Sequence, residues 1–110
     1  MNMEDSKYNK IITAIRQKAI DVLPKGSQIT LFGSRARGDA HENSDWDLHI
    51  LVPGPEKLSF RQTRDYGYPF EEMGWELNQE INTIVHSYSG WKKRWFLPLY
   101  QNIIREGIQL

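Results

Sequence analysis

The segment from Asp45 to Val52 limits the fold more than any other part of this chain. Most of its residues are large and apolar, and Pro53-Gly54-Pro55 follows it, so we expect a strand that ends there. Successive side chains of a strand point to opposite faces of a sheet. One face then carries Asp45 and Asp47, and the other carries four residues that suit a core: Trp46, Leu48, Ile50 and Val52. The chain therefore needs a sheet with one covered face and two acids on the other.

The other expected elements alternate between helices and strands. Apolar residues at helical spacing predict helices at about Asp5–Leu23, Phe60–Leu77 and Lys93–Arg105, with a short helical turn at Ser34–Ala40. Further strands are predicted at Gln28–Phe32 and Glu80–Val85. We expect Pro69 to kink the middle helix or to begin a second segment. Four large apolar residues are also expected in the core: Trp75, Trp95, Phe96 and Leu99.

This order of elements predicts an α+β fold, with a small mixed β-sheet of three or slightly more strands covered by about four helices. The chain has 110 residues and no long linker, so we expect a single domain over residues 1–110.

The composition excludes several kinds of site and partner. The chain has no cysteine, which excludes disulfides and thiolate metal sites. Lys plus Arg and Asp plus Glu number 14 each, so nothing attracts nucleic acid in general, and nucleic acid is not expected as the main substrate. No stretch approaches the roughly 20 apolar residues of a membrane span. We therefore expect a soluble, cytoplasmic protein without a membrane partner.

Two acids on one face of a strand predict a cation site. Like charges side by side repel, and a cation between them relieves the repulsion. Mg²⁺ prefers carboxylate oxygens together with substrate phosphates. Asp is a poor strand former, so Asp45 and Asp47 need a reason to be there; the alternative is a solvated strand face with two surface acids. His49 shares this face and is expected to be packed or hydrogen-bonded rather than a ligand.

Gly33 and Ser34 lie where the first strand ends and the short helix begins, an arrangement that suits a phosphate. Gly33 allows a tight turn and close approach of a ligand, and the N–H groups of a helix start attract an anion. Arg37 shares the helical face of Ser34 and can grip a phosphate. Arg35 points elsewhere, so we expect it at the surface or against a partner. Taken alone, a turn glycine and a capping serine explain this corner better than a ligand does.

The spacing of the two features resembles a known signature. Gly33-Ser34, ten intervening residues and Asp45-Trp46-Asp47 match the DNA polymerase β-like nucleotidyltransferase superfamily. The segments Gly33–Ala40 and Ser44–Leu48 are similar to its minimal, stand-alone members. The resemblance implies a polymerase β-like fold and two Mg²⁺ ions bound by Asp45 and Asp47. It also implies a triphosphate held by Gly33, Ser34 and Arg37.

The resemblance also implies a third carboxylate, usually Asp, on a neighbouring strand. No Asp follows Asp65 in this chain, and Glu80 opens the last predicted strand, in the expected order. We therefore expect Glu80 to complete the catalytic and metal-binding set, with Glu76 and Asp65 as weaker candidates. A surface glutamate at the start of a strand explains Glu80 equally well.

The function that the resemblance implies is transfer of a nucleoside monophosphate, expected to be AMP from ATP. The acceptor would be a hydroxyl of a protein or small molecule, and pyrophosphate would leave. The chain is too short to carry the extra domain of larger relatives, so we expect a helical HEPN-type partner protein, as in toxin–antitoxin pairs, or a homo-oligomer. One alternative is a non-catalytic NTP-binding or antitoxin subunit. Another is an antibiotic-modifying enzyme, against which the missing acceptor domain counts.

Overall fold

A computed structural model describes residues 3–110, with side chains from Ser6 onward. Its elements in chain order are α1 Met3–Val22, β1 Gln28–Phe32, α2 Ser34–Arg37, β2 Trp46–Val52, α3 Phe60–Glu76, β3 Ile81–Ser87, α4 Tyr88–Lys92, α5 Pro98–Glu106 and β4 Ile108–Gln109. The strands form one sheet in the order β3-β2-β1-β4. β2 and β3 are parallel, whereas β1 is antiparallel to β2 and β4. The predicted α+β fold with a mixed sheet is confirmed.

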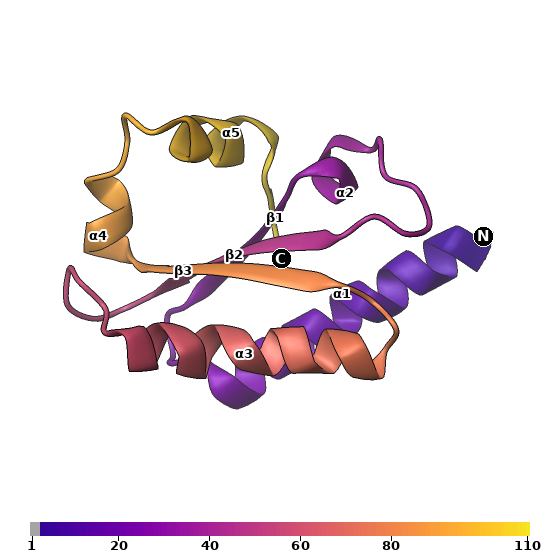
Figure 1. Cartoon of the computed structure of the whole chain (residues 1–110), viewed down its shortest axis with the longest axis horizontal. Helices are drawn as coiled ribbons and strands as arrows, with labels where there is room; N and C mark the ends of the chain where they lie inside the picture. Colours follow the sequence, from indigo (N-terminus) through magenta and orange to yellow (C-terminus); the bar gives the residue numbers. More distant parts are fainter. Residues whose placement is uncertain (1–2) are drawn as a thin grey trace.

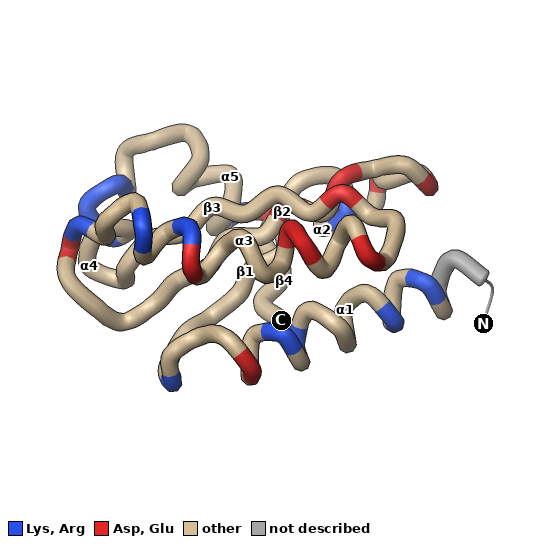
Figure 2. Tube along the Cα trace, turned by 60° about the horizontal axis from the view of Figure 1, so that its bottom comes forward, with Lys and Arg blue, Asp and Glu red and all other residues tan. Residues whose placement is uncertain are grey.

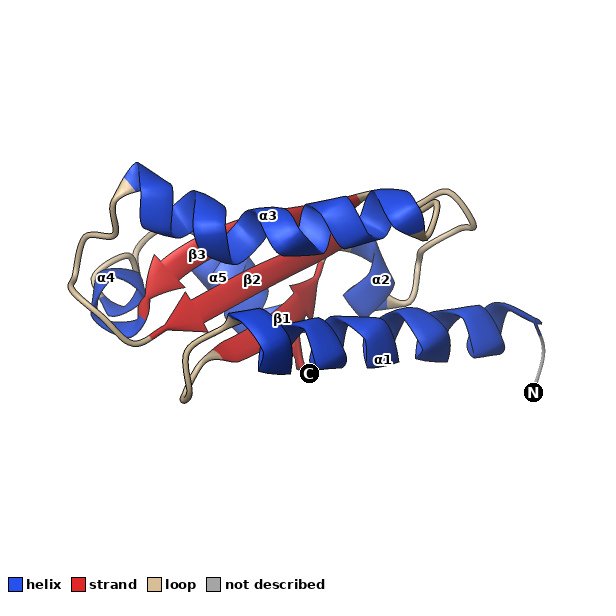
Figure 3. Ribbon diagram, turned by 90° about the horizontal axis from the view of Figure 1, so that it is seen from below, coloured by secondary structure: helices blue, strands red, loops and turns tan. Residues whose placement is uncertain are grey.

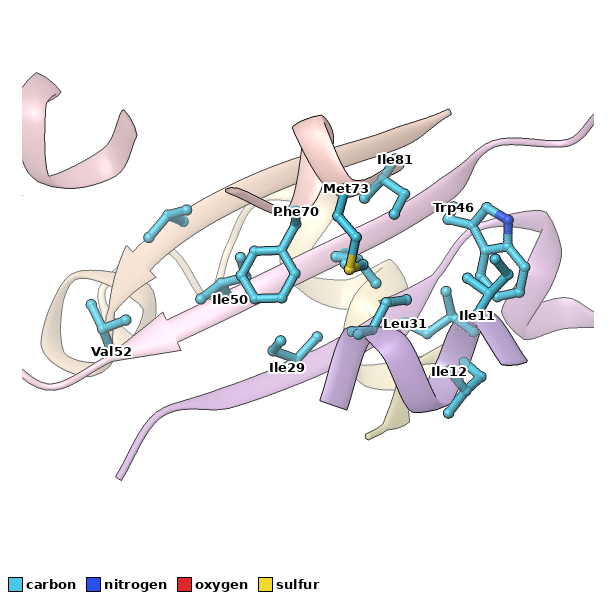
Figure 4. Packing of buried hydrophobic residues seen from close by; sticks show 13 residues of the cluster. Ile11, Ile12, Ile29, Leu31, Trp46, Ile50, Val52, Phe70, Met73 and Ile81 are labelled. Carbon is cyan, nitrogen blue, oxygen red and sulfur yellow. The ribbon is translucent and has the colours of Figure 1, made fainter. Parts of the chain in front are cut away.

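The sheet lies between two sets of helices (Figure 1). α1 and α3 lie over one face, which Figure 3 shows from below, and α2, α4 and α5 lie on the other side. The main core fills the space between the sheet and α1 and α3 (Figure 4). It includes all four residues predicted to point inward from β2, each with no exposed surface: Trp46, Leu48, Ile50 and Val52. The alternation predicted for this strand is therefore confirmed.

α3 is a single helix, so no second segment begins at Pro69. A capping box starts it: the Ser59 side chain accepts from the Gln62 N–H at 3.0 Å, and the Gln62 side chain accepts from the Ser59 N–H at 2.9 Å. Proline inside a helix costs about 3 kcal/mol. Burial of the helix face that carries Phe70 and Met73 against the sheet offsets that cost.

The start of the helix predicted at Lys93–Arg105 is wrong, because α5 begins only at Pro98, and the short helix α4 before it was not predicted. Pro98 is the first residue of α5, and Leu97 before it is extended, as the residue preceding a proline usually is. Trp95 and Phe96 lie between the helices and are each 63% exposed, and Trp75 near the end of α3 is 61% exposed. These three were wrongly expected in the core. Leu99 is partly buried against a second cluster.

The second cluster lies on the other face of the sheet and holds α4 and α5 against it. Leu51 of β2, Trp91 of α4 and Ile103 of α5 are its buried members. The chain then returns to the sheet as β4, which the sequence did not predict and which pairs with Thr30 and Leu31 of β1. Among the residues described, no helix has both the length and the apolar character that a bilayer crossing requires.

Candidate active site

Asp45 and Asp47 lie on the sheet face opposite the main core. Asp45 immediately precedes β2 and Asp47 lies within it. The side-chain amide of Asn82 contacts both carboxylates, at 3.2 Å from Asp45 Oδ2 and 3.2 Å from Asp47 Oδ1. The two side chains therefore converge on one point, as the alternation of β2 requires.

Gly33 lies directly against Asp47. β1 and β2 are antiparallel with Phe32 opposite Asp47, so the chain leaves β1 beside this carboxylate. Gly33 has φ 76° and ψ −159°, a region that only glycine adopts readily. A Cβ at this position would collide with Asp47 Oδ2. The structure therefore brings the Gly33-Ser34 corner and the acidic pair together, while the roles of these residues stay predictions.

The short helix α2 follows this corner, covers only Ser34–Arg37 and ends at Gly38, earlier than the predicted Ala40. The Gly38 N–H donates to the Ser34 carbonyl at 3.1 Å, and its φ of 85° is left-handed. Ser34 thus opens the helix next to Gly33, at the place where a phosphate is predicted to bind.

Arg37 is held by carboxylates. Its Nη1 donates to Glu106 Oε2 at 3.0 Å, and its Nε donates to Asp39 Oδ2 at 3.2 Å. Hydrogen bonds, first to Glu106 and then to Asp39, raise the pKa of the guanidinium. The Glu106 side chain is only 12% exposed, so packing at the end of α5 restricts its movement. Arg37 has to exchange this partner for a phosphate if it binds the triphosphate as predicted.

Arg35 is not a surface or partner contact, as was predicted, but a clamp on the loop before β2. Its Nη2 donates to the Ser44 carbonyl at 2.9 Å and to the Glu42 carbonyl at 3.2 Å. The guanidinium also stacks over the Trp46 ring, 4.5 Å from its centroid. The sequence did not indicate this, because the loop returns to α2 only in the folded chain. The contacts fix the loop that leads into Asp45.

Asn82 is the residue of this site that sequence analysis missed. β2 and β3 are parallel with Asp47 opposite Asn82, so the amide lies between the two carboxylates. Glu80 precedes β3; its backbone carbonyl accepts from the Trp46 N–H at 2.8 Å, and its side chain is exposed. Within residues 3–110 no group of three or more His, Cys, Asp or Glu could hold a metal. The structure thus does not gather Glu80 with the pair, and its role as third ligand stays a prediction.

His49 lies further along the same strand face and is packed and hydrogen-bonded, as predicted. It is 1% exposed, its Nε2 is 2.9 Å from His86 Nδ1, and its ring lies 4.1 Å from that of Trp91. Burial, together with the nearby His86, lowers the pKa of His49 to about 3. His49 is therefore neutral at pH 7 and packs against Trp91 of α4.

The arrangement suits a divalent cation. Hard carboxylate oxygens from Asp45 and Asp47 converge on one point, and the absence of a Cβ at Gly33 lets the backbone lie directly against the Asp47 carboxylate. Many of the acidic segments lie toward this end of the molecule, whereas a group of basic segments lies at α4 (Figure 2). Asp45 and Asp47 are the residues that would hold Mg²⁺. Substrate phosphates and water would supply most of the other ligands.

Comparisons with known proteins agree with this geometry. A model of the nucleotidyltransferase domain family matches residues 8–107, and no curated protein matches. A toxin–antitoxin complex with AMP-PNP is 21% identical with a TM-score of 0.57, over 97% of this chain and 72% of that one. A Sulfolobus solfataricus protein, proposed to be a nucleotidyltransferase, is 20% identical with a TM-score of 0.62, over 96% and 82%. The toxin–antitoxin pair MntA–HpeT with two Asp-to-Glu changes is 22% identical with a TM-score of 0.56, over 92% and 69%.

The solved structures share the fold with this chain, and the family model carries the assignment. Residues 8–107 include Gly33, both acids of β2 and the helices on either side of the sheet. The chain therefore belongs to the nucleotidyltransferase domain family, as a minimal nucleotidyltransferase of the DNA polymerase β-like superfamily.

Proposed function

We propose that this nucleotidyltransferase transfers a nucleoside monophosphate, with AMP from ATP as the expected unit, to a hydroxyl of a protein or small-molecule acceptor. The contact between Gly33 and Asp47 carries the proposal. It brings the predicted phosphate corner, Gly33-Ser34, next to the predicted cation ligands, although ten residues separate Ser34 from Asp45 in the chain. A surface pair of acids would not need, beside it, a backbone conformation that only glycine adopts readily.

The residues of the site would act by positioning and by charge. Asp45 and Asp47 would hold two Mg²⁺ ions, which stabilise the charge on the attacking and leaving oxygens when bound. Gly33, Ser34 and Arg37 would orient the triphosphate so that the acceptor hydroxyl lies in line with the α-phosphorus. The bond from that hydroxyl oxygen to phosphorus then forms, the bond to the β-phosphate oxygen breaks, and pyrophosphate leaves. The hydroxyl proton passes to solvent or to a carboxylate of the pair.

A partner protein is the expected acceptor or neighbour. Trp95 and Phe96 are exposed beside α5 with their rings 5.9 Å apart, and Ile104 of α5 is also exposed. Exposed large apolar residues of this kind often mark protein–protein contacts. Toxin–antitoxin complexes among the similar structures support a partner protein. A helical HEPN-type protein is the partner that the sequence resemblance implies, and self-association is the other way to cover this surface.

The second candidate function is a non-catalytic NTP-binding or antitoxin subunit. It is favoured by one observation: within residues 3–110 the acidic pair gains no third acid. Such a subunit would bind an NTP and a partner without turnover.

Transfer of label separates the two. The purified protein is incubated with Mg²⁺ and each NTP labelled at the α-phosphate, with and without lysate of its source. We expect label on an acceptor, lost in Asp47→Asn and retained in Glu42→Gln, which removes a nearby exposed charge. Label that persists in Asp47→Asn would refute the proposed site. NTP binding without transfer to any acceptor would favour the binding subunit.

A further inference from the structure

Asn82 lies on β3 where its side chain reaches both acids. The register pairs Asp47 with Asn82, and the amide Nδ2 lies 3.2 Å from an oxygen of each carboxylate. An asparagine amide has two N–H donors, so a single side chain serves two acceptors. The pair is thus bridged by a neutral group that satisfies both carboxylates when no cation is bound.

We infer that Asn82 is the third member of the cation site, as a positioning residue that changes roles with occupancy. Without a cation, its N–H groups hold the two carboxylates on one point. With a cation between the carboxylates, rotation of the amide presents Oδ1, an oxygen of the kind that hard cations accept as a ligand. The inference rests on the proposed function, because it takes the acidic pair to bind divalent cations.

Glu80 is the alternative candidate for the third cation ligand, and the two candidates predict opposite results. It lies two residues before Asn82, about 6.6 Å along the strand. Its side chain is exposed and lines a cavity of about 730 Å³ together with Lys7 and Trp75. If Glu80 is the third ligand, Glu80→Gln weakens cation binding; if Asn82 is, the same change leaves it unaltered.

The charge of the site gives the direct test. Asn82→Asp keeps the shape of the side chain and replaces a neutral group by a third carboxylate facing the same point. Mn²⁺ should then bind about tenfold more tightly, because ligand charge sets the affinity of such sites. Asn82→Leu removes the amide and should weaken binding about tenfold, the usual effect of losing a group that orients a metal ligand.

The experiment titrates the whole chain with Mn²⁺ in the absence of NTP and follows free Mn²⁺ by electron paramagnetic resonance. Asn43→Asp is the matched control: it makes the same substitution at an exposed residue two positions before Asp45, so it reports any general effect of added charge. We expect Asn82→Asp to gain affinity, and Asn43→Asp and Glu80→Gln to stay within about twofold of the natural chain.

Two results would overturn the inference. One is an Asn82→Asp chain that binds Mn²⁺ no more tightly than Asn43→Asp does. The other is a Glu80→Gln chain that loses as much affinity as Asp47→Asn. If Asn82→Leu does not fold, the aspartate variant still decides. The proposed function is tested separately by the label-transfer assay on the natural chain. Absence of transfer there would refute catalysis, whereas the Mn²⁺ titration of Asn82→Asp would still test the role of Asn82.

Discussion

Replacing Gly33 by alanine should damage the fold and the cation site together. The backbone at Gly33 has φ 76° and ψ −159°, which costs a residue with a Cβ about 1–3 kcal/mol. The new Cβ would also collide with Asp47 Oδ2 and lie 3.3 Å from Asp47 Cγ. Moving that carboxylate out of a packed position adds about 1–3 kcal/mol. The two effects together predict that Gly33→Ala lowers the free energy of unfolding by about 2–6 kcal/mol.

Gly38 provides the matched control. It also has a positive φ, 85°, but an added Cβ would meet nothing within 4 Å. Gly38→Ala should therefore cost only the left-handed backbone, about 1–2 kcal/mol. Mn²⁺ affinity should fall in Gly33→Ala, because Asp47 has to turn away, and should be unchanged in Gly38→Ala. Urea unfolding, followed by tryptophan fluorescence, measures the free energy of unfolding, and titration with Mn²⁺ measures the affinity.

A double-mutant cycle isolates the collision. Asp47→Ala removes the carboxylate, so Gly33→Ala in that background should cost only its backbone share. The coupling free energy between the two substitutions should then be about 1–3 kcal/mol. Equal costs for Gly33→Ala and Gly38→Ala, with coupling below about 0.5 kcal/mol, would refute the contact on which the site is built.

Three further predictions concern the surroundings of the site. The pKa of His49 is about 3 in the folded chain and about 6.5 in the unfolded chain, so the folded state loses stability as the pH decreases below 6.5. Urea unfolding should show that the free energy of unfolding decreases by about 2 kcal/mol between pH 7 and pH 5, and His49→Gln should largely remove this decrease. An unchanged slope in that variant would contradict this. Arg35→Lys should lower the free energy of unfolding by about 1–2 kcal/mol and speed hydrogen exchange in residues 39–44, because lysine cannot hold both carbonyls and stack on Trp46; unchanged exchange would count against the clamp. Glu106→Gln should tighten NTP binding about two- to fivefold in isothermal calorimetry, since it weakens the hold on Arg37; weaker binding would mean that Glu106 helps Arg37 rather than competing for it.

Local pattern was enough to predict β2 and its two faces. Alternation along the strand decides which side chains share a face, so the buried set that begins at Trp46 and the two acids on the opposite face follow from the sequence alone. β1 was predicted with its observed bounds because the segment is short, rich in β-forming residues and followed by Gly33. The C-terminal helix was predicted to begin at about Lys93 because helical spacing outweighed Pro98, although the effect of proline on the residue before it is also local.

Contacts between distant segments could not be predicted in this way. Arg35 was expected at the surface or against a partner, but its carbonyl partners belong to a loop whose return path no periodicity encodes. Arg37 was placed on the expected helix, yet its strongest hydrogen bond joins it to Glu106, 69 residues further along the chain. The partners of Arg35 are therefore set by the path of the loop before β2, and the Glu106 partner of Arg37 is set by the packing of α5.

The third member of the acidic site shows where such inference stops. Glu80 and Asn82 are two residues apart in the predicted strand Glu80–Val85, so alternation assigns both to one face and cannot choose between them. The choice is made by the parallel register, which pairs Asp47 with Asn82. The outcome matters for the chemistry, because an amide bridges two carboxylates without adding charge, whereas a third carboxylate would increase their repulsion. With Asn82 between them, the two carboxylates can therefore keep their positions without a bound cation.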